Sequence, residues 1–150
     1  EYAAAVGGDW GIKGALAEAA FMMGFEENSD KVKMASFAPL LCNVHSKRWP
    51  YNLINFNSSS WYGLPSYYVQ KIFSQSLGDK TRKLLPVKQS GLTKVTASLA
   101  DDRSDLELKI LNYSNETIEV RVLLDESITE IYMLNTTTLS ADPSKVNSLD

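Results

Sequence analysis

The sequence has little of what metal and disulfide sites are commonly built from. Its 150 residues include a single cysteine, Cys42, and a single histidine, His45. One cysteine excludes an internal disulfide, and together the two counts exclude multi-cysteine and multi-histidine zinc sites. We interpret Cys42 as a small buried apolar side chain and His45 as a loop residue. No metal or other cofactor is predicted.

Clusters of positive charge and long apolar runs are also absent. Fifteen Lys and Arg stand against eighteen Asp and Glu, and no basic cluster could neutralise a run of phosphates. No apolar run approaches the roughly 20 residues needed to span a bilayer. Neither nucleic acid nor a membrane is therefore an expected partner. Because the chain begins at Glu1 without an initiator Met, we expect a piece of a longer protein.

What is present is an ordinary globular composition that changes along the chain. Hydrophobic residues make up 44% and charged residues 22%, which is typical of a folded domain with a core. Alanines, aromatics and helical spacing dominate residues 1–78, whereas β-branched residues, alternation and turn residues dominate residues 79–150. The sequence therefore predicts two regions of different architecture.

In the first region, good helix formers run from Ala15 to Met23, and apolar side chains recur at three- and four-residue steps. This spacing predicts a helix with one buried face, closed by Gly24. The same pattern assigns three glutamates to solvated positions, namely Glu18, Glu26 and Glu27. A second short helix is expected after a cap at Ser29 or Asp30, carrying Val32, Met34 and Ala35.

A strand, a long loop and a helix should follow. The apolar segment 36–44 suits a strand covered on both faces, as in a parallel α/β sheet. An aromatic-rich loop leads to a helix with Pro65 in its first turn and Gly78 at its end. The buried stripe of that helix should comprise Val69, Ile72, Phe73 and Leu77. This order of elements is typical of the end of a repeating β/α barrel.

In the second region the periodicity becomes two. Segments 95–100, 106–111 and 118–122 alternate, and residues 112–116 supply a turn, which predicts an antiparallel hairpin of a β-sandwich. Its wet face should carry Glu107, Lys109, Glu119 and Arg121. The run "TEIYML" at 129–134 is expected to form a further strand, and the polar tail from Asn135 to fray.

Three stretches carry a family resemblance. "EYA", "LAEAAFMMGFEENSDKVKMASFAPLLCNV" and "KRWPYNLINFNSSSWYGLPSYYVQKIF" resemble the α-L-arabinofuranosidases of glycoside hydrolase family fifty-one, in the branch with plant and fungal members. The match covers about residues 1–78, with looser agreement beyond. The resemblance implies the last elements of a (β/α)8 catalytic barrel over 1–78 and part of a jelly-roll-like antiparallel β-sandwich over 79–150. One departure is "RWPYN", where the family usually has a "RWNPD"-like run.

The resemblance also implies an activity. Family members are retaining enzymes that remove terminal non-reducing arabinofuranosyl residues from arabinan- and arabinoxylan-type glycans, without a cofactor. Glu1 matches the Glu of the family's Ser-Glu-Tyr motif, which implies that it is the catalytic nucleophile. The acid/base belongs to an Asn-Glu pair far upstream of this chain, so the piece alone is expected to be inactive. The family further suggests an extracellular or periplasmic location.

Other candidate positions depend on weaker signals. Tyr2, Asn43 and Trp49 are candidates for substrate binding, because aromatic faces pack against sugar rings and an amide can bind hydroxyls. Packing between loops is the competing interpretation for the aromatics, and a structural loop role is that for Asn43. Four asparagines stand in N-x-Ser/Thr sequons and are possible glycosylation sites, namely Asn57, Asn112, Asn115 and Asn135.

Two alternatives to the enzyme hypothesis stay open. The chain could be an autonomous β-sandwich module that binds carbohydrate or a partner and has no catalytic activity, with the first half as a helical appendage. Residues 80–150 alone could also be a purely structural domain. A sandwich fold hosts many functions and does not choose between these alternatives. Nothing in the sequence indicates an oligomeric state.

Overall fold

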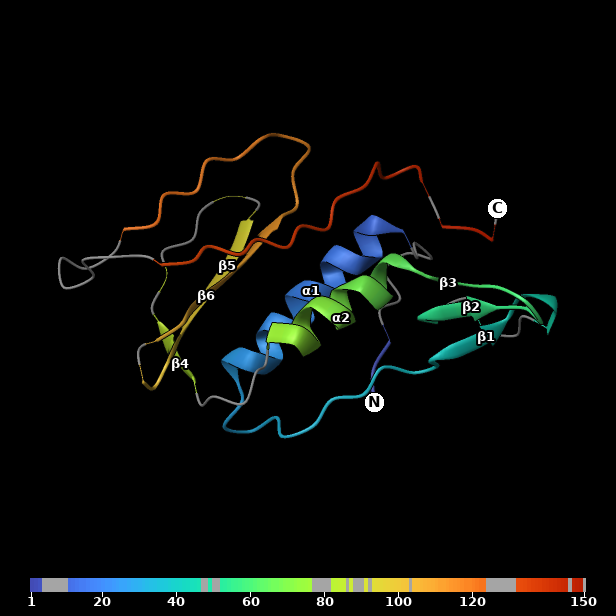
Figure 1. The fold of residues 1–150 in the computed structure, drawn as a ribbon, viewed down its shortest axis with the longest axis horizontal. Coiled ribbons are helices and arrows are strands. Elements are labelled where there is room, and N and C mark those ends of the chain that lie inside the picture. The colour runs from blue at the N-terminus through green and yellow to red at the C-terminus, as the bar shows by residue number, and fades with distance from the viewer. Residues whose placement is uncertain are drawn as a thin grey trace.

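The structure is a computed structural model. It describes residues 1–3, 11–46, 49, 52–76, 82–85, 87, 91, 93–102, 104–123, 132–145 and 147–149. Two packed helices, α1 (Ile12–Glu27) and α2 (Pro65–Ser76), lie between two three-stranded sheets (Figure 1). One sheet consists of β1 (Leu41–Asn43), β2 (Ile54–Phe56) and β3 (Trp61–Gly63). The other consists of β4 (Arg82–Leu85), β5 (Thr93–Ala100) and β6 (Leu106–Asn112).

Helix α1 is longer than predicted. It begins at Ile12, and Gly24 lies inside it instead of closing it. Asn28 caps the C-terminal end, where its Nδ2 donates to the carbonyl oxygen of Gly24 at 2.8 Å and so satisfies one orphan acceptor. The apolar face of α1 packs on α2 and on one residue of β6. This core comprises Ile12, Ala15, Ala19, Met23, Val69, Phe73 and Leu111.

The short helix predicted over residues 29–35 was wrong. The chain makes a single turn at 28–31, where the backbone N–H groups of Lys31 and Val32 donate to the carbonyl of Asn28 at 2.9 and 2.8 Å, and then runs without helix to Ser36. Met34 is 89% exposed. A helix in water gains most of its stability from a packed apolar face, and Met34 has no surface to pack on here.

The strand predicted over residues 36–44 is shorter and less covered than expected. Only Leu41–Asn43 is a strand, and Phe37 makes an isolated bridge before it. Pro39 has no N–H to donate and therefore interrupts a ladder between them. Leu41 is 56% exposed, so one face is open, whereas Cys42 is buried as predicted.

Parallel pairing surrounds this segment. Tyr2 pairs in parallel with Phe37, and β1 pairs in parallel with β2, with Cys42 opposite Asn55. Residues 1–3 and residues 36–38 are therefore extended segments that lie parallel to each other, one before and one after helix α1, as in a βαβ unit. His45 lies in the short 3₁₀ helix η1 (Val44–Ser46) that follows β1.

The predicted long loop contains a small antiparallel hairpin, β2–β3, with Asn55 opposite Tyr62. Strands of three residues give too short an alternation to be read from the sequence. Gly63 ends β3, and the ring of Tyr67 lies over it so closely that a Cβ there would overlap the ring. Helix α2 then begins at Pro65, as predicted.

The stripe predicted for α2 is confirmed where the structure describes it. Val69 and Phe73 are buried and Ile72 is half-buried. Leu77 and Gly78, the last stripe residue and the predicted terminator, lie outside the described residues.

In the second sheet, the predicted hairpin of segments 106–111 and 118–122 was wrong. Strand β6 pairs with β5 in antiparallel register, with Val95 opposite Ile110, and residues 118–123 form no strand. Between β5 and β6, the carboxylate of Asp102 accepts the N–H of Ser104 at 3.0 Å, and the N–H of Ala100 donates to the carbonyl of Asp105 at 2.9 Å. Strand β4 was not predicted. Of the strand expected at 129–134, residues 129–131 lie outside the described residues and 132–134 form no strand.

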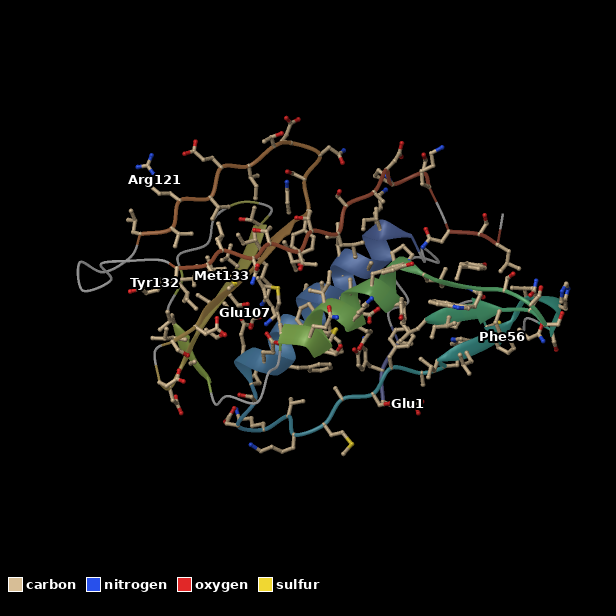
Figure 2. The ribbon with its side chains drawn as sticks, viewed as in Figure 1. Glu1, Phe56, Glu107, Arg121, Tyr132 and Met133 are labelled. Atoms are coloured by element: carbon tan, nitrogen blue, oxygen red, sulfur yellow. The ribbon has the colours of Figure 1, made fainter. Side chains whose placement is uncertain are left out.

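The faces of β6 are also reversed relative to the prediction. Glu107 and Lys109 point toward the helices (Figure 2). Lys109 Nζ lies 3.1 Å from Glu26 Oε1 on α1 and 2.8 Å from Glu107 Oε2, and it sits 5.2 Å from the ring centroid of Phe73 on α2. The side chains exposed on the opposite face are apolar, namely Leu106, Leu108 and Ile110.

The C-terminal segment runs back across the helices (Figure 1). It has no helix or strand over the described residues 135–145 and 147–149. Leu139 nevertheless packs against the core, and Asn147 Nδ2 donates to the carbonyl oxygen of Gly63 at 2.6 Å. The tail is therefore attached to the helices and to β3, where the sequence predicted fraying.

The packing predicts effects of very different size for two Met→Ala substitutions. Met23→Ala removes a side chain that is 0% exposed in the core and should lower the free energy of unfolding by about 2–5 kcal/mol. Met34→Ala removes one that is 89% exposed and should change it by less than about 0.5 kcal/mol. Urea unfolding of a protein that contains this chain measures both, and equal effects would contradict this core assignment.

Candidate functional site

Tyr2 is the best anchored of the predicted site residues. Its backbone N–H donates to the carbonyl of Ser36 at 2.9 Å, and its carbonyl accepts the N–H of Ala38 at 3.0 Å. Its ring makes edge-to-face contacts with Phe21 and Phe25 of α1, with centroids 5.5 and 5.2 Å away. A third such contact, with Phe37, has a centroid distance of 5.6 Å.

A polar network continues from the hydroxyl of Tyr2. Gln70 Nε2 on α2 donates to the Tyr2 hydroxyl at 2.5 Å and also donates to Glu18 Oε1 on α1. Ser66, one turn before Gln70 on α2, is buried and lies close enough to the Glu18 carboxyl group to lower the pKa of that group. Three segments that are distant in the sequence therefore meet at one buried cluster, which we define as Tyr2, Glu18, Ser66 and Gln70.

Glu18 was predicted to be solvated, and this prediction was wrong. Its side chain is 1% exposed, and Oε2 has no hydrogen bond of ordinary geometry. Burial raises the pKa of Glu18, and the hydrogen bond from Gln70 and the nearby Ser66 offset only part of the rise. Burial likewise raises the pKa of Tyr2. The Gln70 hydrogen bond lowers that pKa, and the nearby Glu18 charge adds to the rise.

The other two glutamates of α1 are not free of contacts either. Glu26 is half-buried and pairs with Lys109, and Glu27 Oε2 lies 2.8 Å from Lys94 Nζ. Their assignment to solvated positions therefore holds for Glu27 alone, which is exposed at the end of the helix while paired with Lys94.

Glu1 lies on the exposed side of this arrangement. Successive side chains along an extended segment point to opposite faces. Because Tyr2 points toward the helices, Glu1 points away from them, and Figure 2 shows it at the edge of the molecule. The geometry leaves its carboxylate accessible to a ligand from that side.

The remaining predicted residues lie along the segment next to Tyr2. Asn43 ends β1 and is exposed, and its Oδ1 accepts the N–H of His45 at 2.9 Å. Trp49 is 52% exposed, and its carbonyl accepts a weak hydrogen bond from Cys42 Sγ at 3.9 Å. Asn43 thus belongs to segment 36–43, and Trp49 contacts Cys42 of that segment. Tyr2 pairs with the segment through Phe37, and Glu1 precedes Tyr2.

Sequence reasoning missed Glu18 and Gln70. Glu18 is the one charged residue between Gly14 and Phe25, and an isolated carboxylate in a long apolar helix is a signal for a buried polar contact. Nothing local marks Gln70, because its partners are 52 and 68 residues away. Two further buried polar residues, Asn52 and Asn55, were also missed, and their side-chain amides have no hydrogen-bond partner.

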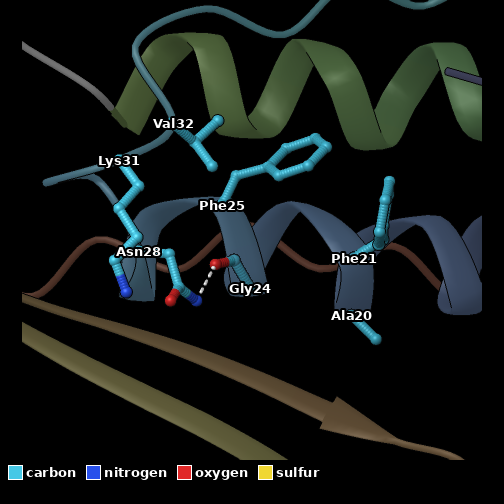
Figure 3. A pocket seen from close by; sticks show the side chains of 7 residues that line it. All are labelled: Ala20, Phe21, Gly24, Phe25, Asn28, Lys31 and Val32. Atoms are coloured by element: carbon cyan, nitrogen blue, oxygen red, sulfur yellow. Dashed lines mark hydrogen bonds between the residues drawn. The ribbon is translucent and has the colours of Figure 1, made fainter. Parts of the chain in front are cut away.

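A shallow groove lies on the outer side of α1 (Figure 3). It encloses about 390 Å³ and shares Phe21 and Phe25 with the contacts of Tyr2. Its lining comprises Ala20, Phe21, Gly24, Phe25, Asn28, Lys31 and Val32. No carboxyl group is among these lining residues.

Two other kinds of feature are absent from the described part of the chain. No three His, Cys, Asp or Glu side chains there are grouped as metal ligands. No helix there is long and apolar enough to cross a membrane.

The four sequon asparagines differ in how their side chains are engaged. Asn57 Oδ1 accepts the N–H groups of Ser59 and Ser60, both at 2.8 Å. Asn112 Nδ2 donates to the carbonyl of Glu116 at 2.8 Å. Asn115 and Asn135 are exposed. Glycosylation at all four stays a prediction.

The burial of Glu18 predicts a pH-dependent stability. As the pH rises from the ordinary glutamate pKa of 4.5 through the raised folded value, the unfolded chain loses its proton first, so stability falls. Each unit of pKa elevation corresponds to about 1.4 kcal/mol of lost unfolding free energy. Glu18→Gln should remove this loss, whereas Glu119→Gln, at an exposed site, should keep it. Parallel pH profiles for wild type and Glu18→Gln in urea unfolding would contradict the assignment.

Comparisons with known proteins agree with the family resemblance. A family model described as the alpha-L-arabinofuranosidase C-terminal domain matches residues 5–150. Probable alpha-L-arabinofuranosidase A of Aspergillus niger is 38% identical over 143 residues, which are 93% of this chain and 22% of that protein. Alpha-L-arabinofuranosidase 2 of Arabidopsis thaliana is 37% identical over 120 residues, which are 79% of this chain and 18% of that protein.

A solved structure is also similar. It is that of an arabinose-bound α-L-arabinofuranosidase of glycoside hydrolase family fifty-one, with a TM-score of 0.59 and 33% identity over 68% of this chain and 16% of that chain. The chain thus spans about a fifth of the length of the curated relatives described above. Since the family model covers nearly the whole chain, the chain belongs to the family of α-L-arabinofuranosidase C-terminal domains.

Proposed function

We propose that this chain is part of a retaining α-L-arabinofuranosidase that hydrolyses terminal non-reducing arabinofuranosyl residues from arabinan- or arabinoxylan-type glycans. The family membership and the names of the relatives support the activity. The observation that carries the proposal is the placement of Glu1. Its carboxylate is accessible, and the next residue, Tyr2, is held by two backbone hydrogen bonds to the parallel segment 36–38.

The chemistry requires two carboxyl groups about 5–5.5 Å apart. The Glu1 carboxylate would attack the anomeric carbon, while the second carboxyl group donates a proton to the departing glycosidic oxygen as its bond to that carbon breaks. Water would then hydrolyse the resulting ester with the second group as base, so the configuration is retained. The resemblance assigns that second group to a position upstream of Glu1, and the chain alone should therefore be inactive.

The substrate class follows from the same comparison. The similar solved structure is arabinose-bound, which supports an arabinose-containing glycan as the partner. We propose that Asn43 binds a sugar hydroxyl and that Trp49 packs on a sugar face, since both are exposed beside segment 36–43. Contact of Tyr2 with substrate stays a prediction.

The parallel bridge between Tyr2 and Phe37, with helix α1 between them in the sequence, supports a barrel end over residues 1–78, with a sandwich over residues 79–150. The alternative of an autonomous β-sandwich module is less well supported. Leu111 of β6 belongs to the same core cluster as Met23 of α1 and Phe73 of α2. An independent module would bury a core of its own and would not contribute a residue to the core between the helices.

The nucleophile assignment predicts the behaviour of Glu1→Ala in the longer enzyme. Turnover of an aryl α-L-arabinofuranoside should fall by about 10⁴-fold or more, because the covalent step is lost. Added azide should restore part of the rate by replacing the carboxylate. Glu119→Gln is the control for loss of an acidic side chain elsewhere. A Glu1→Ala enzyme with unchanged turnover would refute the assignment.

A further inference from the structure

We propose that Tyr2, Gln70 and Glu18 are positioning residues for Glu1. A hydrogen-bonded chain from Glu18 on α1 through Gln70 on α2 fixes the side chain of Tyr2, and Tyr2 fixes the backbone that carries Glu1. This inference rests on the function proposed above for Glu1. It assigns none of the three side chains a direct contact with the reacting atoms.

The first step is the link between Tyr2 and Glu1. A carboxylate at residue 1 can be no better placed than the peptide that joins it to residue 2. The backbone of Tyr2 makes two hydrogen bonds, to Ser36 and Ala38. These bonds fix the register of Tyr2 relative to the neighbouring segment. They leave rotation of the segment about its own axis to be set by the Tyr2 side chain, which points the opposite way from Glu1.

The second step is how that side chain is held. Three edge-to-face contacts, with Phe21, Phe25 and Phe37, enclose the ring. Such contacts favour a particular tilt of the ring but do not bind its hydroxyl group. A hydrogen bond is directional, and the bond from Gln70 Nε2 to the hydroxyl is the contact that fixes how far Tyr2 reaches between the helices.

The third step is the double use of the Gln70 amide. A side-chain amide nitrogen has two N–H donors, and Gln70 directs one to Tyr2 and the other to Glu18 Oε1. The acceptor on α1 therefore sets the plane of the amide, and with it the position of the donor that Tyr2 receives. Helix α2 is thereby connected to α1 and to the Glu1 segment through one side chain.

The fourth step is the burial of Glu18. The carboxyl group of Glu18 is 1% exposed, and one of its oxygens has no hydrogen-bond partner among the described residues. Such a group lowers the free energy of unfolding, and an apolar residue of similar size would lower it less. Its hydrogen bond to Gln70 is what an apolar residue could not provide. The arrangement therefore sacrifices stability for a defined orientation next to the proposed nucleophile.

The experiment uses the longer enzyme and three variants, Tyr2→Phe, Gln70→Leu and their combination. Tyr2→Phe keeps the ring contacts and removes only the hydroxyl. Each single variant should lower kcat about tenfold or more, because small misplacements of a reacting group are costly, with KM changed by less than about threefold. The loss should be as large for substrates with good leaving groups as for poor ones, because the nucleophile, not the acid, is displaced.

Two further comparisons test whether the three residues act in sequence. If Gln70 acts through the Tyr2 hydroxyl, the double variant should be no slower than the slower single variant, whereas multiplied losses would overturn the proposal. Glu18→Gln keeps an acceptor oxygen and should stay within about threefold of wild-type kcat, while Glu18→Leu should lose about tenfold or more. Equal rates for these two variants would also overturn it.

The matched control is Val69→Ala, which removes core packing beside Gln70 on the same helix. It should lower stability and leave kcat unchanged below the unfolding transition. A comparable loss of kcat in Val69→Ala would mean that any damage to α2 suffices, and would overturn the proposal. Full activity of Tyr2→Phe together with an inactive Glu1→Ala would overturn the positioning alone, whereas an active Glu1→Ala would overturn both the positioning and the proposed function.

Discussion

The structure depends on helix α1 being buried on several sides at once. Between Gly14 and Phe25 it carries one charged residue, and small side chains such as Ala15 and Ala19 allow close packing. A helix that is apolar nearly all round must be covered nearly all round. Helix α2 covers one side, the aromatic contacts of Tyr2 a second, and β6 a third. The site beside Tyr2 and the second sheet are therefore held by the same helix.

The contact between α1 and the second sheet explains the reversed faces of β6. Lys109 is drawn inward by Glu26, Glu107 and the ring of Phe73, and partly buried pairs of this kind orient elements more than they stabilise them. Since side chains alternate along a strand, this turns the apolar set at 106, 108 and 110 outward. An outward apolar face is what a second sheet would cover, so the reversal is compatible with the proposed sandwich.

The sequence allowed the two long helices to be predicted, wrongly added a short helix over residues 29–35, and left the strand pairing undetermined. Helix α2 follows from local features, since Pro65 suits a first turn and Val69 and Phe73 lie one helical turn apart. Alternation in segment 106–112 indicates an antiparallel strand. The alternation is the same whether the pairing strand comes before or after this segment in the sequence. The connection that contains Asp102 and Ser104 pairs it with the preceding strand, β5. The burial of Glu18 depends on Gln70, 52 residues away, and no local pattern reports such a contact. Glu1 could be selected only from its family resemblance.

The shared core also bears on how the two regions relate. The change of periodicity near residue 79 marks a change of secondary structure, yet Leu111 packs with Met23 and Phe73 in one cluster, and Lys94 and Lys109 pair with the end of α1. A shift of the second sheet would therefore move α1 as well. Glu18 lies on α1 two turns before these contacts, so the sheet supports the network that reaches Tyr2. A region remote from the chemistry can thus contribute to it by holding one helix still.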